Sequence, residues 1–159
     1  MLFRDALPSD PIAHRLLSDY FASRELDFTG KRGYTIVHPG DGQFTPPDGV
    51  FIIVELDGDP VGCGGIRSLG AASDGGERFE VKHLWVERRA RGTGLGGKLL
   101  DELEARAIGF GATEAVLDTN ASLTSAAALY RSRGYVSIEP YNDNPNATNW
   151  YGKILPPLN

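Results

Sequence analysis

Apolar residues recur along the chain at two spacings, one typical of helices and one typical of strands. A helix is expected to begin at Ser9-Asp10-Pro11, where a capping side chain precedes a proline, and apolar residues follow at helical spacing over 12–20. A leucine stripe predicts a second helix over 95–107, and an apolar face predicts a third over 123–133, ended by Gly134. The sequence therefore predicts three amphipathic helices.

The strand-like segments are short and separated by glycine-rich turns. Segments 50–56 and 60–66 flank Asp57-Gly58-Asp59, a combination that predicts an antiparallel hairpin. Further strands are expected at 79–86, 115–117, 135–138 and 148–155. Between Thr29 and Gly49 there are five glycines and three prolines, which predict loops of the kind that often form substrate rims.

The order of these elements determines the expected fold class. A helix and antiparallel strands come first, and strand-helix-strand-helix-strand follows, which indicates a mixed sheet covered by helices. The expected class is α/β, of the α+β kind. With 159 residues the chain has a common size for one domain, so a single domain is expected over 1–159.

Composition narrows the functional classes. With 41% hydrophobic and 23% charged residues the chain is typical of globular proteins, and its net charge of -5 disfavours a nucleic-acid partner. Cys63 is the single cysteine, so neither an internal disulfide nor a metal site is expected, and a reducing, cytoplasmic location fits. The sequence has no signal-peptide pattern and no apolar run of roughly 20 residues, so no membrane partner is expected.

The most informative motif is the glycine-rich loop Gly92-Thr93-Gly94-Leu95-Gly96-Gly97-Lys98. Its glycines allow backbone N–H groups to approach phosphate oxygens, and it opens a predicted helix whose N-terminus favours anions. A plain glycine turn would not explain why Arg89 and Arg91 stand beside it. A phosphate-bearing ligand is therefore expected here.

Two nucleotide-binding interpretations of this loop fit less well. Gly92-x-Gly94-x-x-Gly97 matches a dinucleotide fingerprint, but that fingerprint directly follows a buried apolar strand, whereas here 87–91 intervenes. The spacing from Gly92 to Lys98 also suits a Walker A loop. However, Leu99 occupies the position where a Ser or Thr hydroxyl has to bind magnesium.

A third interpretation fits the residues better. Arg89-Ala90-Arg91-Gly92-Thr93-Gly94 resembles the Arg/Gln-x-x-Gly-x-Gly/Ala pattern of the GNAT superfamily of acetyl-CoA-dependent N-acetyltransferases. The resemblance extends from about Glu80 to Tyr135, with Leu84-Trp85-Val86 before the loop and 126–135 as a second landmark. Two landmarks at the right separation are more specific than one glycine loop.

The resemblance implies a fold and a co-substrate. The fold would be a mixed, mostly antiparallel central sheet with a splayed strand pair, flanked by helices. Acetyl-CoA would bind with its pantetheine arm along Leu84, Trp85 and Val86. Its pyrophosphate would lie on the loop, at Arg89, Arg91, Gly92, Thr93, Gly94, Leu95 and Gly96. No metal is implied.

The resemblance also implies the catalytic groups. Glu80 lies six residues before Val86, where several family members carry a catalytic glutamate, and it would serve as a base or only orient the amine. Tyr130 matches the tyrosine that protonates the CoA sulfur, although an aromatic core residue is the plainer alternative. Val86 N–H would polarise the thioester carbonyl.

One departure concerns the pantetheine contact. Many relatives carry an asparagine three residues before the alanine that matches Ala126, but this sequence has Leu123 there. Polar neighbours could replace it, namely Asn120, Ser122, Thr124 and Ser125.

The acceptor is less well marked. Arg32, Tyr34, His38 and Arg67 lie in regions that could face it, and an arginine would suit the carboxylate of an amino acid. The run 141–146 resembles a Tyr-x-x-Asn-Pro segment of some bacterial relatives and forms either the pocket rim or, more commonly, a solvated turn. His83 is expected to alternate away from Glu80 on its strand, in a structural or surface role.

The resulting hypothesis is an enzyme that acetylates a small primary amine such as an amino acid and acts as a monomer or homodimer. Two alternatives remain at this point: an enzyme acting on a protein or peptide amine, and a non-catalytic CoA-sensing module.

Overall fold

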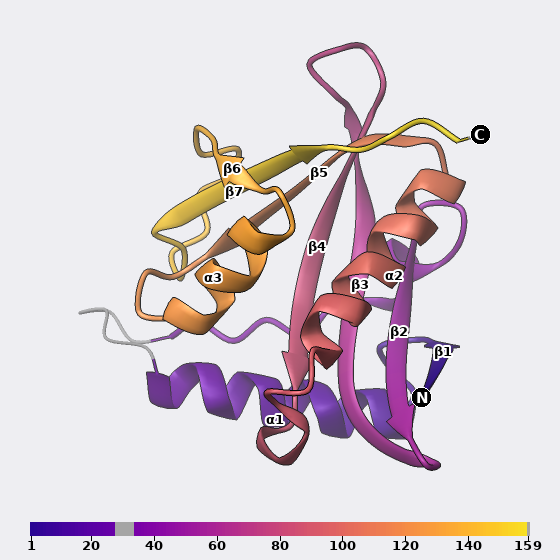
Figure 1. Ribbon diagram of the computed structural model, residues 1–159, viewed down its shortest axis with the longest axis vertical. Helices are drawn as coiled ribbons and strands as arrows, with labels where there is room; N and C mark the ends of the chain where they lie inside the picture. Colours follow the sequence, from indigo (N-terminus) through magenta and orange to yellow (C-terminus); the bar gives the residue numbers. More distant parts are fainter. Residues whose placement is uncertain (28–33, 159) are drawn as a thin grey trace.

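The computed structural model describes residues 1–27 and 34–158, and its centre is an open seven-stranded sheet (Figure 1). The strands lie in the order β1-β2-β3-β4-β5-β7-β6. Their bounds are β1 Leu2–Ala6, β2 Gly49–Leu56, β3 Asp59–Ala71, β4 Glu77–Val86, β5 Ala112–Thr119, β6 Val136–Ser137 and β7 Asn149–Ile154. The α-helices in this part of the chain are α1 Pro11–Asp27, α2 Leu95–Gly109 and α3 Thr124–Ser132, with 3-10 helices η1 Asp41–Phe44 and η2 Arg88–Ala90.

Strand β2 shows how the sheet separates two apolar cores. Val50, Ile52 and Val54 belong to the core that contains the leucines of α2, whereas Phe51 and Ile53 belong to the core that contains α1. Because side chains alternate between the two faces of a strand, α2 and α1 cover opposite faces of the sheet. The near-continuous apolar run of β2 reflects this burial on both faces.

The parallel pair β4–β5 opens partway along its length. The two strands pair from Glu77 opposite Ala112 to Glu80 opposite Val116, and the other neighbouring strands are antiparallel. Beyond Glu80 the strands diverge, and α3 lies beside the opening (Figure 1). The expectation of a mixed, mostly antiparallel sheet with a splayed pair is confirmed.

The local predictions can be compared with these elements. Helix α1 begins at Pro11 as expected, because the Asp10 carboxylate accepts hydrogen bonds from Ile12 N and Ala13 N at 2.9 and 3.3 Å. The hairpin is confirmed, and its turn residues Asp57 and Gly58 both have positive φ.

Strand β1 was not predicted. It is an edge strand whose residues are mostly exposed or half-buried, so it carries no apolar alternation that a sequence pattern could detect. The strand expected at 135–138 is reduced to Val136–Ser137.

Candidate active site

Two adjoining cavities lie at the opening between β4 and β5. The larger cavity, about 720 Å³, is bounded by α1, the segment 34–43, β4, 118–120 and 142–146. The loop cavity, about 520 Å³, is bounded by the end of β4, the glycine-rich loop and residues 122–130. They share Arg24, Leu84, Leu123 and Tyr130. The site is therefore two chambers that meet at these four residues.

The glycine-rich loop has the backbone shape that its sequence requires. Gly92 and Gly94 adopt φ of 78° and 80°, a left-handed conformation that side-chain-bearing residues rarely adopt. Gly94 is the N-cap of α2 and makes no side-chain capping bond, so the first N–H groups of the helix are left for a ligand. Arg91 lines the loop cavity, and its Nε donates to Val86 O at 2.8 Å.

Tyr130 lies at the junction of the chambers. It projects from α3, is only 6% exposed, and lines both cavities. Its ring contacts Tyr135 and Tyr151. Among the described residues its hydroxyl makes no hydrogen bond, and burial raises its pKa above the ordinary tyrosine value. Tyr130 therefore holds a neutral phenol with its proton available.

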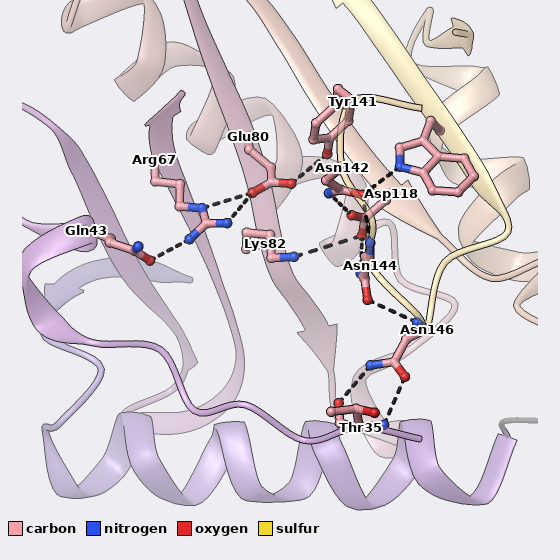
Figure 2. A network of polar contacts seen from close by, with 11 residues as sticks. Thr35, Gln43, Arg67, Glu80, Lys82, Asp118, Tyr141, Asn142, Asn144 and Asn146 are labelled. Carbon is pink, nitrogen blue, oxygen red and sulfur yellow. Dashed lines mark hydrogen bonds and ion pairs between the residues drawn. The ribbon is translucent and has the colours of Figure 1, made fainter. Parts of the chain in front are cut away.

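Glu80 is enclosed by partners. Its carboxylate, which is 0% exposed, accepts Arg67 Nε at 2.9 Å and Tyr141 Oη at 2.6 Å, as Figure 2 shows. Arg67 also bonds Gln43 and lines the larger cavity, which Glu80 itself does not reach. Burial, followed by the charge of Glu80, raises the pKa of Tyr141. Glu80 therefore contacts the cavity through Arg67.

Sequence reasoning missed the carboxylate that does line the larger cavity. Asp118, near the end of β5, accepts Asn142 Nδ2 at 2.6 Å and Asn144 Nδ2 at 3.1 Å, and it lies 3.9 Å from Lys82 Nζ (Figure 2). These partners come from β4 and from the 141–146 segment. The segment is thus part of the rim, although Asp143 and Pro145 within it are exposed. The sequence signal that could have pointed to this polar rim was the pattern Asn-x-Asn-x-Asn over 142–146.

Comparisons with known proteins agree with this geometry. A family model described as the acetyltransferase (GNAT) family matches residues 13–135, which is most of the chain. The chain belongs to the GNAT acetyltransferase family. It is therefore an acyltransferase by family, with the GNAT fold.

Individual relatives support the assignment. The uncharacterized N-acetyltransferase YjgM of Escherichia coli K12 is 32% identical over 148 residues, covering 83% of this chain and 86% of that protein. IAA acetyltransferase of Azospirillum brasilense is 34% identical over 95 residues. That match covers 60% of each protein, so the chain spans about three fifths of the Azospirillum protein's length.

Solved structures show the same fold. A Klebsiella pneumoniae protein, provisionally named an acyl-CoA N-acyltransferase, is 26% identical with a TM-score of 0.74, covering 97% of both chains. A GNAT phosphinothricin acetyltransferase from Sinorhizobium meliloti, solved in complex with AcCoA, is 18% identical with a TM-score of 0.64. The likeness covers 97% of this chain and 88% of that one.

The GNAT motif residues do not all face the loop cavity. Gly92, Gly94, Leu95 and Gly96 line it together with Arg91. Arg89 instead donates to Glu87 and Asp59 on the surface, where its side chain is 59% exposed. Thr93 does not line the cavity, and its hydroxyl donates to Ala90 O at 2.8 Å, which braces the turn.

The expected pantetheine-contacting residues are divided between the two chambers. Trp85, Val86, Thr124 and Ser125 line the loop cavity, whereas Leu84 lines both. Leu123, which replaces the usual GNAT asparagine, also lines both. Asn120 lines the larger cavity, where its Nδ2 donates to Asn146 O at 3.0 Å. Of the polar substitutes for asparagine, Ser122, Thr124 and Ser125 face the loop cavity.

The expected alternation of His83 away from Glu80 is wrong for a local reason. His83 has a positive φ of 58°, and the β3–β4 register shifts between Cys63 and Gly65. This irregularity brings His83 and the preceding Lys82 to the same cavity. Burial lowers the pKa of His83 to about 3, so its ring is neutral.

The remaining expected acceptor residues have mixed outcomes. Tyr34, His38 and Arg67 line the larger cavity. Arg32 lies outside the described residues. No group of His, Cys, Asp or Glu in 1–27 and 34–158 is arranged to hold a metal. In the same ranges no helix has the length and apolar character to cross a bilayer.

Proposed function

We propose that this protein moves an acetyl group from acetyl-CoA directly to the primary amine of a small molecule such as an amino acid. The observation that carries the proposal is the meeting of two cavities at Tyr130, one beside the glycine-rich loop and one lined by polar side chains. Direct transfer requires a site for each substrate and a shared point where they meet. The loop cavity would hold acetyl-CoA and the larger cavity the amine.

The loop cavity suits acetyl-CoA chemically. The left-handed glycines and the uncapped N-terminus of α2 present backbone N–H groups and a positive dipole end, which pyrophosphate requires. The AcCoA-bound GNAT structure from Sinorhizobium supports the assignment by its likeness of fold.

Acetyl-CoA supplies an activated acyl group, and this chain's residues orient it and supply protons. The ammonium first loses a proton to water, and the neutral nitrogen then attacks the thioester carbon. The carbon–sulfur bond breaks, the sulfur takes the proton of the Tyr130 hydroxyl, and the resulting tyrosinate regains a proton as the acylated nitrogen loses one. Burial raises the pKa of Tyr130, so its hydroxyl keeps its proton until negative charge develops on the sulfur. Tyr130 is the proposed acid.

Glu80 is proposed to position other groups. Two hydrogen-bonding residues enclose its carboxylate, and it does not line the larger cavity, so direct proton abstraction would require Arg67 or Tyr141 to move. Because Glu80 does not line the cavity, these contacts favour a positioning role through Arg67 over both expected roles, proton abstraction from the amine and direct orientation of it. Through Arg67 it fixes a cation at the cavity wall.

The direct test is thiol release from acetyl-CoA with purified protein across amino acids, polyamines, aminoglycosides, arylamines and short peptides. Turnover confined to one class of small amine is the expected result. Turnover with peptides alone would favour a protein-directed enzyme. Binding of acetyl-CoA without any turnover would overturn the proposal in favour of CoA sensing.

A further inference from the structure

The larger cavity presents opposite charges side by side. Asp118 is the one carboxylate among the described residues that line it, and Lys82 Nζ lies 3.9 Å from Asp118 Oδ1. The Asp118 side chain is 7% exposed and the Lys82 side chain 20%. Lys82 comes from β4 and Asp118 from β5, beyond the last paired residues of these strands. This pair therefore spans the opening of the sheet.

Asp118 is held rigidly. Asn142 and Asn144 each turn an amide NH2 group to one of its oxygens. Their orientation is determined by the network, because Asn142 Oδ1 accepts Trp150 Nε1 and Asn144 Oδ1 accepts Asn146 N. Each carboxylate oxygen of Asp118 accepts one of these bonds and keeps capacity for another donor. Such fixed, unsaturated acceptors are typical of a binding site.

Lys82 is held loosely by comparison. Its 3.9 Å separation from Asp118 exceeds hydrogen-bond length, so the attraction is Coulombic alone. Arg67, in contrast, already donates to both Glu80 and Gln43. Of the two cations that the sheet strands contribute to this cavity, Lys82 is therefore readier than Arg67 to accept an anionic group.

We propose that Asp118 and Lys82 together select a zwitterionic acceptor, whose ammonium binds Asp118 and whose carboxylate binds Lys82. The ammonium and carboxylate of an α-amino acid are complementary in charge to Asp118 and Lys82. Their binding would replace the one loose Lys82–Asp118 ion pair by direct, charge-assisted hydrogen bonds to each residue. The inference rests on the proposed acetyl transfer and narrows its acceptor to small amines that carry a carboxylate.

The position of Asp118 agrees with transfer. Tyr130 lines the same cavity; burial raises its pKa most, the charge of Arg24 lowers it, and that of Asp118 raises it. An ammonium bound at Asp118 therefore lies within electrostatic range of the proposed acid. A peptide N-terminus or lysine side chain would offer Asp118 its ammonium but would leave Lys82 without a carboxylate.

Matched acceptors test the selection. Free amino acids, the corresponding amino-acid amides and the decarboxylated amines are compared by kcat/KM for acetyl transfer. The carboxylate should be preferred by about 10- to 100-fold, the range expected for a hydrogen bond between charged groups.

Variants assign the preference to residues. Lys82→Met should remove the preference by raising KM for the acids while leaving the amides unchanged. Asp118→Asn should lower kcat/KM for all three acceptor types by about 10- to 100-fold. Asp143→Asn is the matched control, since Asp143 is exposed in the same segment and should have no effect. Acetyl-CoA binding, measured by calorimetry, shows whether each variant is folded. If one single variant fails to fold, the double variant Lys82→Met/Asp118→Asn, which loses one charge of each sign, replaces it in the comparison.

The outcomes separate the two proposals. Equal turnover of amines with and without a carboxylate, or a Lys82→Met variant that keeps the preference, would overturn the selection and leave acetyl transfer standing. Acetyl-CoA binding without turnover of any acceptor would overturn both.

Discussion

Single residues at this site differ in how completely their polar atoms are satisfied. The Tyr130 hydroxyl has no hydrogen-bond partner among the described residues, whereas the Glu80 carboxylate has Arg67 and Tyr141. A group that exchanges a proton with a substrate needs a free hydrogen-bond donor or acceptor in the cavity, whereas a group that holds other side chains in place does not. The two candidates that the sequence suggested together thus have different expected roles.

Replacing Tyr130 by phenylalanine tests the acid role. The ring contacts with Tyr135 and Tyr151 would remain and only the proton donor would be lost. We expect kcat to fall by about 10²- to 10⁴-fold, with acetyl-CoA affinity unchanged by calorimetry. Tyr135→Phe is the control, because its hydroxyl donates to Glu104 in the core, and its kcat should be retained. Normal turnover of Tyr130→Phe would disprove the assignment.

Replacing Glu80 by glutamine separates orientation from proton abstraction. The amide keeps an oxygen for Arg67 or Tyr141, so an orienting role predicts a fall in kcat of less than about tenfold and an unchanged acidic limb of the pH–rate profile. A fall of about 10²-fold or more, with loss of that limb, would identify Glu80 as the base.

Among the elements, β4 and the loop that follows it determine the site. Periodicity predicted the helices and most strands, because their apolar faces pack against the sheet. It could not predict the irregularity at His83, since a positive φ leaves no mark in the order of apolar residues. The glycine-rich loop was predictable because only glycine adopts its backbone shape at little cost.

Gly94→Ala tests that loop. Open space surrounds the added methyl group, so the cost is the left-handed conformation alone, about 1–2 kcal/mol. If the loop rearranges to relieve this strain, acetyl-CoA should bind about 5- to 30-fold more weakly, as measured by calorimetry. Gly109→Ala, at the end of α2 and equally unobstructed, should leave affinity unchanged. Unchanged affinity of Gly94→Ala would show that the loop geometry is not needed.

The larger cavity is a property of the whole molecule. Asn146 joins residues 111 positions apart, by accepting from Thr35 N at 2.9 Å and donating to Thr35 O at 2.7 Å (Figure 2). Asp118 enters the cavity only because β5 diverges from β4. Such long-range juxtapositions are why Asp118 was missed, whereas Tyr130 was found from a local motif.

Asn146→Ala should loosen this closure. Two exposed hydrogen bonds are lost, so the free energy of unfolding should fall by about 1–2 kcal/mol in urea denaturation. The Thr35 amide should also exchange its hydrogen faster. Asp143→Ala, in the same segment, should change neither quantity. Unaltered stability and exchange in Asn146→Ala would show that the contact contributes nothing.

The splayed strands have a further consequence, for self-association. Unpaired strand edges usually invite pairing with another copy of a chain, and proteins keep outer edges short or charged. Here β6 is two residues long, and β1 carries Arg4 and Asp5, which are paired with Glu55 and Arg106. The long unpaired edges, beyond Glu80 on β4 and Val116 on β5, face each other within the sheet. The opening between β4 and β5 thus turns the unpaired backbone N–H and C=O groups of these strands towards each other, away from neighbouring molecules.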